Sequence, residues 1–217
     1  MQLQPILKLL GCCCLIASYS FKQAATNIPY KLPPVKDTSV LSLFEETSFK
    51  RLMIDARLNN NRVKGFSEQR LPENRYELFD FVDADKQVKK LDRGNYYLIG
   101  KRYKISDNTI GLLMFGSDDK ISTSSQLFVW DIKAGKIVQT VYLATSYGDE
   151  EGFSNAISYL EDVNGDKKMD IVNITCSSDY SSKKKYQVAS TIYLFNGQRF
   201  IATKQKADLK KFPAQCK

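Results

Sequence analysis

From Tyr76 onward, the sequence is a succession of short apolar runs separated by turn residues, and this pattern limits the fold more than any other feature. The runs are rich in Val, Ile, Tyr and Phe, which favour β-strands. Most connections are too short for crossover helices, so neighbouring strands must run antiparallel. We therefore predict a mainly β domain, built as an antiparallel meander or a partial-propeller-like sheet. The predicted strands span residues 76–82, 95–101, 109–116, 126–132, 136–144, 155–161, 169–175, 187–195 and 198–203.

Two hairpin turns are marked by their residues. Asn196-Gly197 lies between two apolar runs, and both residues accept the positive φ that a two-residue turn requires. A second turn, Lys133–Lys136, contains Gly135 and joins the run that ends at Trp130 to the next run. Both turns support the meander.

One helix is predicted ahead of the strands, over residues 42–58. Ser42 and Glu45 have the spacing of a capping box. Apolar residues then follow at helical spacing, which predicts one buried face. These residues are Phe44, Phe49, Leu52, Met53 and Ala56.

The nine residues 162–170 read Asp-Val-Asn-Gly-Asp-Lys-Lys-Met-Asp. Oxygen-bearing side chains occupy the first, third, fifth and ninth places, and a glycine in the fourth place lets the backbone curl. Hard cations such as Ca²⁺ take six to eight oxygen ligands, and short acidic loops supply them, whereas Mg²⁺ keeps several waters. Two interpretations are open: a calcium site, or an ordinary Asx-Gly turn on a solvated hairpin.

The segment from Phe153 to Ile174 resembles an FG-GAP/VCBS-type repeat, in which one strand enters an acidic loop and a second strand leaves it. The resemblance implies a structural Ca²⁺ held by side chains and one backbone carbonyl. The implied side-chain ligands are Asp162, Asn164, Asp166 and Asp170, and the implied carbonyl belongs to Lys168.

The chain departs from that family in two respects. Lys167 and Ser154 stand where the family has glycine, and a residue with a Cβ adopts a left-handed backbone less easily. The family also builds propellers from several copies of the repeat, whereas this chain has one clear copy and a poor echo at Asp83–Asp85. A compact sheet or partial propeller therefore fits better than a full ring.

Residues 1–20 have the layout of an export signal, because Lys8 precedes an apolar stretch that is too short to span a bilayer. Two processing routes are open. The chain is cleaved near Ser20, or Leu9-Leu10-Gly11-Cys12 acts as a lipobox and Cys12 is lipidated. The expected localisation is periplasmic or secreted, with membrane attachment only through such a lipid anchor.

The remaining chain divides into three parts: an extended lead-in at 21–38, a β-rich domain at 39–203, and a basic tail at 204–217. Two cysteines lie outside the signal, Cys176 and Cys216, and an oxidising compartment favours their pairing. A bridge between them would hold the tail and contribute about 4 kcal/mol in the chain-entropy model.

The formal net charge is +8, with lysine clusters at residues 183–185 and along the tail. These clusters are solvated loops, or they attract anionic envelope polymers, lipid head groups or an acidic protein. A nucleic-acid partner is not expected, because no aromatic-basic platform accompanies the lysines.

The sequence contains no histidine, which excludes Ser-His-Asp and Cys-His nucleophile systems and histidine-ligated zinc. Asp149, Glu150 and Glu151 could serve as paired carboxylates in glycoside hydrolysis, but adjacent acids in a glycine-flanked loop are typical of a solvated turn. No catalytic residue is assigned. Asn173-Ile174-Thr175 is a glycosylation sequon only in a eukaryotic secretory chain.

We expect an exported, non-enzymatic binding protein with a calcium-stabilised loop, acting on a macromolecular partner as an envelope inhibitor or immunity-type protein. Two alternatives stay open: a histidine-free polysaccharide hydrolase, and a structural envelope lipoprotein.

Overall fold

The architecture is that of a computed structural model, and the description concerns the compact unit within residues 32–217. The described residues are 39–56, 69–83, 85–117, 122–148, 152–179, 186–214 and 216. The expected signal at 1–20 and lead-in at 21–38 lie outside them. Within these described ranges, none of the helices has the length and apolar character needed to cross a bilayer.

The chain forms one short α-helix, one 3-10 helix and twelve strands in the part that is described. The helices are α1 (Ser39–Ser42) and η1 (Glu73–Phe79). The strands are β1 (Glu45–Glu46), β2 (Arg51–Asp55), β3 (Phe81–Val82), β4 (Val88–Lys89), β5 (Tyr96–Ser106), β6 (Thr109–Ser117), β7 (Ser122–Asp131), β8 (Lys136–Gly148), β9 (Gly152–Glu161), β10 (Asp170–Asp179), β11 (Gln187–Phe195) and β12 (Phe200–Ala202).

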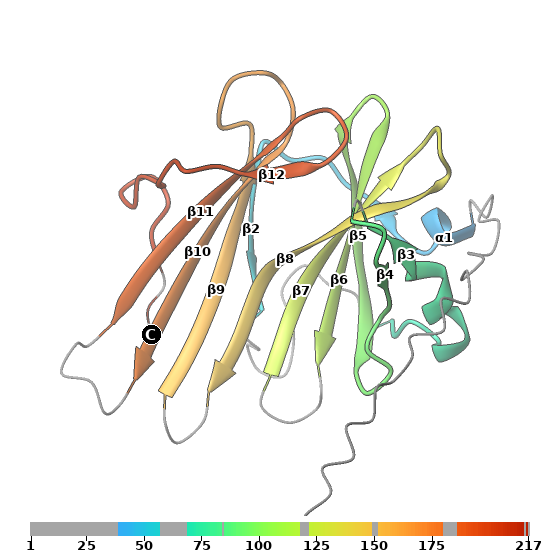
Figure 1. Ribbon diagram of the computed structural model, residues 1–217, viewed down its shortest axis with the longest axis horizontal. Coiled ribbons are helices and arrows are strands. Elements are labelled where there is room, and N and C mark those ends of the chain that lie inside the picture. Colours follow the sequence, from blue (N-terminus) through green and yellow to red (C-terminus); the bar gives the residue numbers. More distant parts are fainter. Residues whose placement is uncertain are drawn as a thin grey trace, which may run out of the picture. The chain divides into compact units, whose positions relative to one another are not determined.

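Two antiparallel meanders make up most of the sheet, β5-β6-β7-β8 and β9-β10-β11-β12 (Figure 1). Each strand pairs with the next one along the chain, as the short predicted connections require. β1 adds a parallel edge to β5, and β3 and β4 form a separate two-stranded ribbon. The predicted mainly β, meander-like fold class is confirmed.

Among the described residues, strand pairing between the two meanders is confined to one end of β8 and β9. Thr145–Gly148 of β8 pair with Phe153–Ala156 of β9, and beyond that point the two strands separate. β2 takes the vacated edge of β9, with Arg51 opposite Glu161. A β-bulge in β8 leaves Leu143 without a partner on β7 close to the point of separation. The sheet therefore splits, and β2 fills the split.

A central apolar core lies between the two meanders. Leu127 and Val129 of β7 contribute to it from one side, and Leu160 of β9 and Ile171 of β10 from the other. Tyr103 of β5 is also buried there, and its hydroxyl has no hydrogen-bond partner among the described residues. Burial on both sides fixes how the meanders stack.

Each meander also has an outer apolar cluster. The outer face of β5–β7 is covered by η1 and its neighbours, through contacts that include Phe79 with Phe128 at 5.1 Å between ring centroids. The outer face of β9–β11 is covered by the C-terminal segment, where Phe212 packs on Tyr159.

Both predicted hairpin turns are confirmed. Gly197 has φ +98°, and the Asn196 carboxamide accepts hydrogen bonds from the amides of Gln198 and Arg199. Gly135 has φ +61° in the turn between β7 and β8.

The helix predicted over 42–58 is wrong in its described part. α1 ends at Ser42, and residues 51–55 form β2 instead. Leu52, Ile54 and Ala56 recur at every second position and contact the central core, which is a strand period. Met53, counted toward the helical face, is 43% exposed. Pairing with β9 supplies hydrogen bonds and packing that override the local helical spacing.

The strand predicted at 76–82 is also corrected: residues 73–79 form the 3-10 helix η1, and only Phe81 and Val82 are extended. Tyr76 and Phe79 lie three positions apart, and both are buried on one side of η1. Their spacing suits a 3-10 turn, in which residues i and i+3 are aligned.

Candidate functional site

The acidic loop between β9 and β10 is organised around the Asp162 carboxylate. Its Oδ1 accepts hydrogen bonds from the amides of Gly165 at 2.7 Å and Asp166 at 3.1 Å. Its Oδ2 accepts a hydrogen bond from the Lys167 amide at 2.9 Å. One carboxylate thus satisfies three consecutive amide donors that the strands leave unpaired.

Two loop residues have left-handed backbone conformations, Gly165 at φ +81° and Lys167 at φ +65°. A Cβ at Gly165 would meet no atom within 4 Å, so glycine serves conformation there and not close packing. Lys167 adopts the strained region that the FG-GAP/VCBS pattern gives to glycine. The hydrogen bond from its backbone amide to Asp162 Oδ2 holds it in that conformation.

Asp170 fastens the loop to the sheet. Its side chain is fully buried, and its two oxygens accept hydrogen bonds from the amides of Phe195 at 2.9 Å and Val163 at 3.1 Å. Burial raises the pKa of Asp170, and the hydrogen bonds from these two backbone amides partly oppose that rise. The carboxylate therefore links the start of β10 to the end of β11.

The other two side-chain ligands implied by the resemblance are Asn164 and Asp166, and both make local contacts. Asn164 Oδ1 accepts a hydrogen bond from the Asp166 amide at 3.0 Å. Asp166 accepts from the Lys168 amide at 2.9 Å and pairs with Lys168 Nζ at 3.1 Å. These contacts with Lys168 lower the pKa of Asp166.

The donor chemistry of the loop suits calcium, since it offers carboxylate and amide oxygens in the order that hard cations require. The geometry is that of a turn closed on its own amides. Within the described ranges, no three Asp, Glu, Cys or His side chains are gathered closely enough to hold a metal ion. For the cation to bind, Asp166 would have to exchange Lys168 for it.

The weak echo of the acidic loop at Asp83–Asp85 is a turn. Asp83 Oδ1 accepts hydrogen bonds from the amides of Asp85 and Gln87, both at 2.9 Å. Its Oδ2 lies 3.2 Å from Lys89 Nζ. Asp83 therefore closes the ribbon between β3 and β4.

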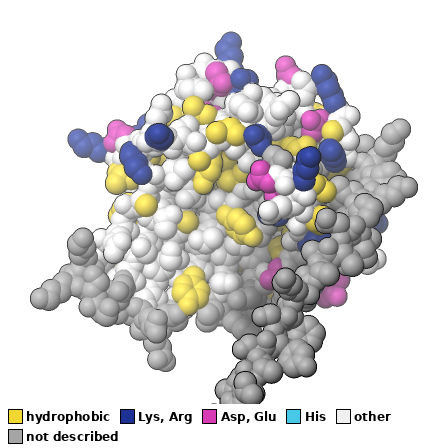
Figure 2. Space-filling model, in the orientation of Figure 1, with side chains coloured by type: hydrophobic (Ala, Val, Ile, Leu, Met, Phe, Trp, Pro, Cys, Tyr) yellow, Lys and Arg dark blue, Asp and Glu magenta, His cyan; other side chains and the backbone are white. Residues whose placement is uncertain are grey.

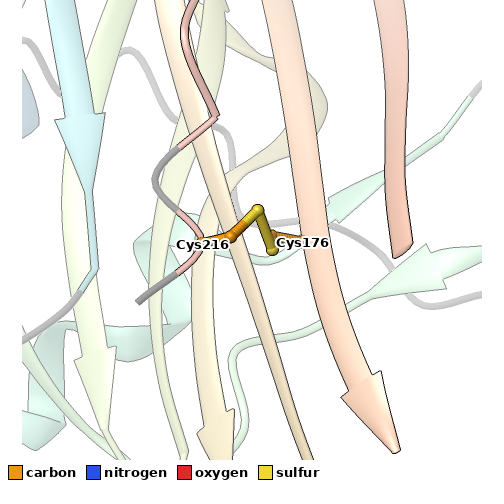
Figure 3. Close-up of a disulfide and its surroundings, with 2 residues drawn as sticks. All are labelled: Cys176 and Cys216. Atoms are coloured by element: carbon orange, nitrogen blue, oxygen red, sulfur yellow. A yellow bond between two sulfur atoms is a disulfide. The ribbon is translucent and has the colours of Figure 1, made fainter. Parts of the chain in front are cut away.

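Cys176 and Cys216 form a disulfide with their Cα atoms 5.5 Å apart, as predicted (Figure 3). The C-terminal segment was predicted to be held through Cys216, but further contacts hold it as well. The Tyr159 hydroxyl donates to the Pro213 carbonyl at 2.8 Å, and Phe212 is buried against the Tyr159 ring.

Arg51 reinforces the same segment. Its guanidinium lies 4.7 Å from the ring centroid of Tyr159 and 5.0 Å from that of Phe212. It also donates to the Lys211 carbonyl at 2.8 Å and pairs with Glu161 at 3.3 Å. The basic tail is thus a packed part of the domain.

Several other predicted positions lie outside the described residues. They are Cys12, Asp149, Glu150, Glu151 and the lysines at 183–185. The sequon residue Asn173 is described, and its amide nitrogen donates to the Leu143 carbonyl and to Ser158 Oγ, both at 3.0 Å. That nitrogen is engaged inside the sheet and is not presented for modification.

A second candidate site lies on the outer face of β7 and β8, and it was not predicted from the sequence. Three cross-strand pairs form it, and all six side chains are uncharged. We call this surface the tyrosine face. Its pairs are Gln126 with Tyr142, Ser124 with Thr145, and Ser122 with Tyr147. Tyr142 is 61% exposed and Tyr147 is 40% exposed.

Two adjoining hollows run along the tyrosine face, with volumes of about 580 Å³ and about 370 Å³. They share Gln126 and Tyr142 on the sheet side and Lys90 and Leu91 on the opposite wall. Because they share these four residues, the two hollows adjoin, and we call them together the trough. Thr140 lines the first hollow, and its hydroxyl oxygen has no hydrogen-bond partner among the described residues.

Charge is distributed unevenly over the visible side of the molecule (Figure 2). Lysine and arginine side chains lie mostly in the upper half of that view, whereas the lower centre shows hydrophobic side chains among uncharged ones. In the same orientation, β8 and its neighbours run through this lower centre (Figure 1).

The sequence gives only a partial signal for the tyrosine face. Ser122-Thr-Ser-Ser-Gln126 is a polar, uncharged run that continues directly into an apolar strand. Tyr142 and Tyr147 are five positions apart, a spacing that puts two residues of a regular strand on opposite faces. The bulge at Leu143 returns them to one face, and a bulge cannot be read from residue types alone.

The comparisons with known proteins assign no family: no family model, no curated protein and no solved structure matches this chain. Function must therefore be argued from the geometry of the loop and of the tyrosine face.

Proposed function

We propose that this chain is an exported binding protein that recognises a macromolecular partner through the tyrosine face. The observation that carries the proposal is the exposure of Tyr142 and Tyr147 in an uncharged strip beside a trough. Binding surfaces favour tyrosine because its ring offers a large rigid area and its hydroxyl a polar contact. Their centres are also depleted of charge.

Export is the second part of the proposal. It is supported by the layout of residues 1–20 and by the disulfide between Cys176 and Cys216, because such bridges persist in oxidising compartments. An envelope inhibitor or immunity-type role fits a histidine-free exported chain with an open binding face.

Calcium binding by the loop at 162–170 is the third part. Its support is the resemblance to FG-GAP/VCBS repeats and the oxygen chemistry of the loop. The cation would neutralise the three mutually repelling carboxylates of Asp162, Asp166 and Asp170 and so make the hairpin between β9 and β10 more rigid. A calcium-dependent rise in unfolding temperature that Asp166→Ala abolishes is the test.

The binding role can be tested by photo-cross-linking in the cells that make the protein. A benzophenone amino acid replaces Tyr142 or Tyr147, and in a control chain it replaces Ile201, which is 41% exposed on β12. We expect adducts from positions 142 and 147 and none from 201. Each adduct is then identified, and the purified partner is titrated with wild type and Tyr142→Ala.

At least a tenfold loss of affinity in Tyr142→Ala, corresponding to about 1.4 kcal/mol, would support the proposal. Equal adducts from all three positions, or an affinity that is unchanged by Tyr142→Ala, would contradict it.

A further inference from the structure

We infer that the trough along the tyrosine face binds a neutral polysaccharide, with Tyr142 and Tyr147 stacking on its pyranose rings. The inference rests on the proposed binding function and names the ligand class for the same site. Its basis is the uncharged chemistry of the tyrosine face, the distance between the two tyrosines along β8, and the trough beside them.

The chemistry of the strip matches that of an uncharged sugar. Pyranose rings present apolar C–H faces, which stack on aromatic rings, and hydroxyls, which exchange hydrogen bonds with neutral groups. Tyr142 and Tyr147 supply the rings, and Ser124 and Thr145 supply hydroxyl groups between them. Gln126 is buried and donates to Ser124 Oγ at 3.4 Å. No member of the six-residue strip carries a charge.

The two rings are spaced along one strand on one face. Five residues of extended chain span roughly 16 Å, and a bulge shortens this to roughly 13 Å. That length suits an oligosaccharide of several linked rings better than a single sugar. The two hollows share Gln126 and Tyr142, so the trough continues past the central tyrosine in both directions.

A charged polymer fits this site less well. In the second hollow, the charged lining residues are Lys90 and Asp92, which are of opposite sign. The first hollow mixes Lys89, Lys90 and Arg199 with Asp83 and Asp85. Since neither sign prevails and the sheet side is neutral, the trough offers an anionic chain no net attraction.

The test uses the full disulfide-bonded mature chain and calorimetric titration with chitohexaose and cellohexaose, two neutral hexasaccharides. An anionic control, oligogalacturonate, is titrated in parallel. We expect one of the neutral ligands to bind, with Tyr142→Ala and Tyr147→Ala each weakening it about tenfold, or about 1.4 kcal/mol. Tyr142→Phe should keep the affinity within about threefold, because the stacking ring remains.

The matched control is Tyr186→Ala, since Tyr186 is 39% exposed, packs on Phe153 and is not among the residues that line either hollow. It should bind as wild type does. A thermal melt of each variant confirms that loss of binding is not loss of folding.

Three outcomes overturn the inference. The first is neutral-ligand binding that survives both alanine substitutions, and the second is a preference for oligogalacturonate. The third is absence of neutral binding while cross-linking from position 142 captures a protein; the binding function would then stand and only the ligand class would fall. If neither cross-linking from 142 and 147 nor titration detects a ligand, both the inference and the proposed function fail.

Discussion

The side chain of Gln139 on β8 pairs with both backbone groups of Phe200 on β12. Gln139 Nε2 donates to the Phe200 carbonyl at 3.0 Å, and the Phe200 amide donates to Gln139 Oε1 at 2.8 Å. The carboxamide of Gln139 thus makes the two hydrogen bonds to Phe200 that a neighbouring strand would otherwise make. It joins the last strand of the first meander to the last strand of the second, in the part of β8 that does not pair with β9.

Removing this link should destabilise the domain. Gln139→Ala leaves the Phe200 amide and carbonyl without their partner, and we expect a loss of about 1–3 kcal/mol in the free energy of unfolding. Urea denaturation measures it. Gln198→Ala, in the exposed turn before β12, is the matched control and should stay within about 0.5 kcal/mol of wild type. Equal values for the two variants would show that the link is not stabilising.

The disulfide should stabilise the domain by restricting the unfolded chain. Cys176 and Cys216 are 40 positions apart, and the chain-entropy model then gives about 4 kcal/mol. Cys216→Ser should lose most of that amount in urea denaturation. Reducing the wild type should have the same effect, and reducing the variant should have none. A variant as stable as oxidised wild type would mean that the contacts of Phe212 and Tyr159 hold the segment without the bridge.

Tyr103→Phe should raise stability. The Tyr103 hydroxyl is buried in the central core without a partner among the described residues, and burial raises its pKa well above the usual value. Removing an unsatisfied hydroxyl while keeping the ring should add about 1–2 kcal/mol in urea denaturation. Tyr159→Phe is the contrasting variant. Its hydroxyl bonds to Pro213, so that change should lower stability. A less stable Tyr103→Phe protein would reveal a partner for the hydroxyl.

Acid should weaken the β3–β4 ribbon through Asp83. The Gln87 amide, followed by contacts with Lys89 and Asp85, lowers the pKa of Asp83. Because the folded pKa is below the unfolded one, the stabilisation is complete above the unfolded pKa. It is lost as pH falls through the folded pKa, below about pH 4. Asp83→Asn should therefore be less stable than wild type at pH 7 and lose less stability between pH 5 and 2, as urea denaturation across that range would show. A wild-type slope in the variant would exclude Asp83 as a source of the acid sensitivity.

Calcium binding by the acidic loop can be tested through competition between Ca²⁺ and the Lys168 ammonium group for Asp166. Lys168 Nζ lies 3.1 Å from Asp166 Oδ2 and would compete with a cation for that oxygen. Lys168→Met should therefore bind Ca²⁺ more tightly than wild type, and Asp166→Ala should not bind it. Thermal unfolding in EDTA and in millimolar CaCl₂ reads this out, since calcium at 100 times its dissociation constant adds about 2.7 kcal/mol. Identical curves in EDTA and calcium for wild type and Lys168→Met would identify the loop as an ordinary turn.

The strand series was predictable because most of its strands have their own local signals. The turns at Gly135 and Gly197 fix two hairpins, and turn residues act within a few positions of the chain. The acidic loop was located for the same reason, since Asp162 organises donors within five residues of itself. Residue types thus placed the loop, and they left open whether it binds a metal.

What escaped prediction depends on distant contacts. Residues 51–55 have spacings that suit both a helix and a strand, and only β9 selects the strand. The tyrosine face requires the bulge at Leu143, which lies close to the point where β8 parts from β9. The packing of the C-terminal segment depends on Arg51, which lies 160 positions before Lys211 in the chain.

The position of β2 in the split sheet has a consequence for the order in which the molecule assembles. Leu52 lies opposite Leu160, more than a hundred positions later in the chain. Synthesis from the N-terminus therefore produces β2 long before its partner strand exists. The apolar residues Leu52 and Ile54 have no partner strand until β9 has been made. Pairing β2 with β9 then closes a loop of more than a hundred residues, which is entropically costly and slow. The split in the sheet is thus filled late, by one of the first strands to be made.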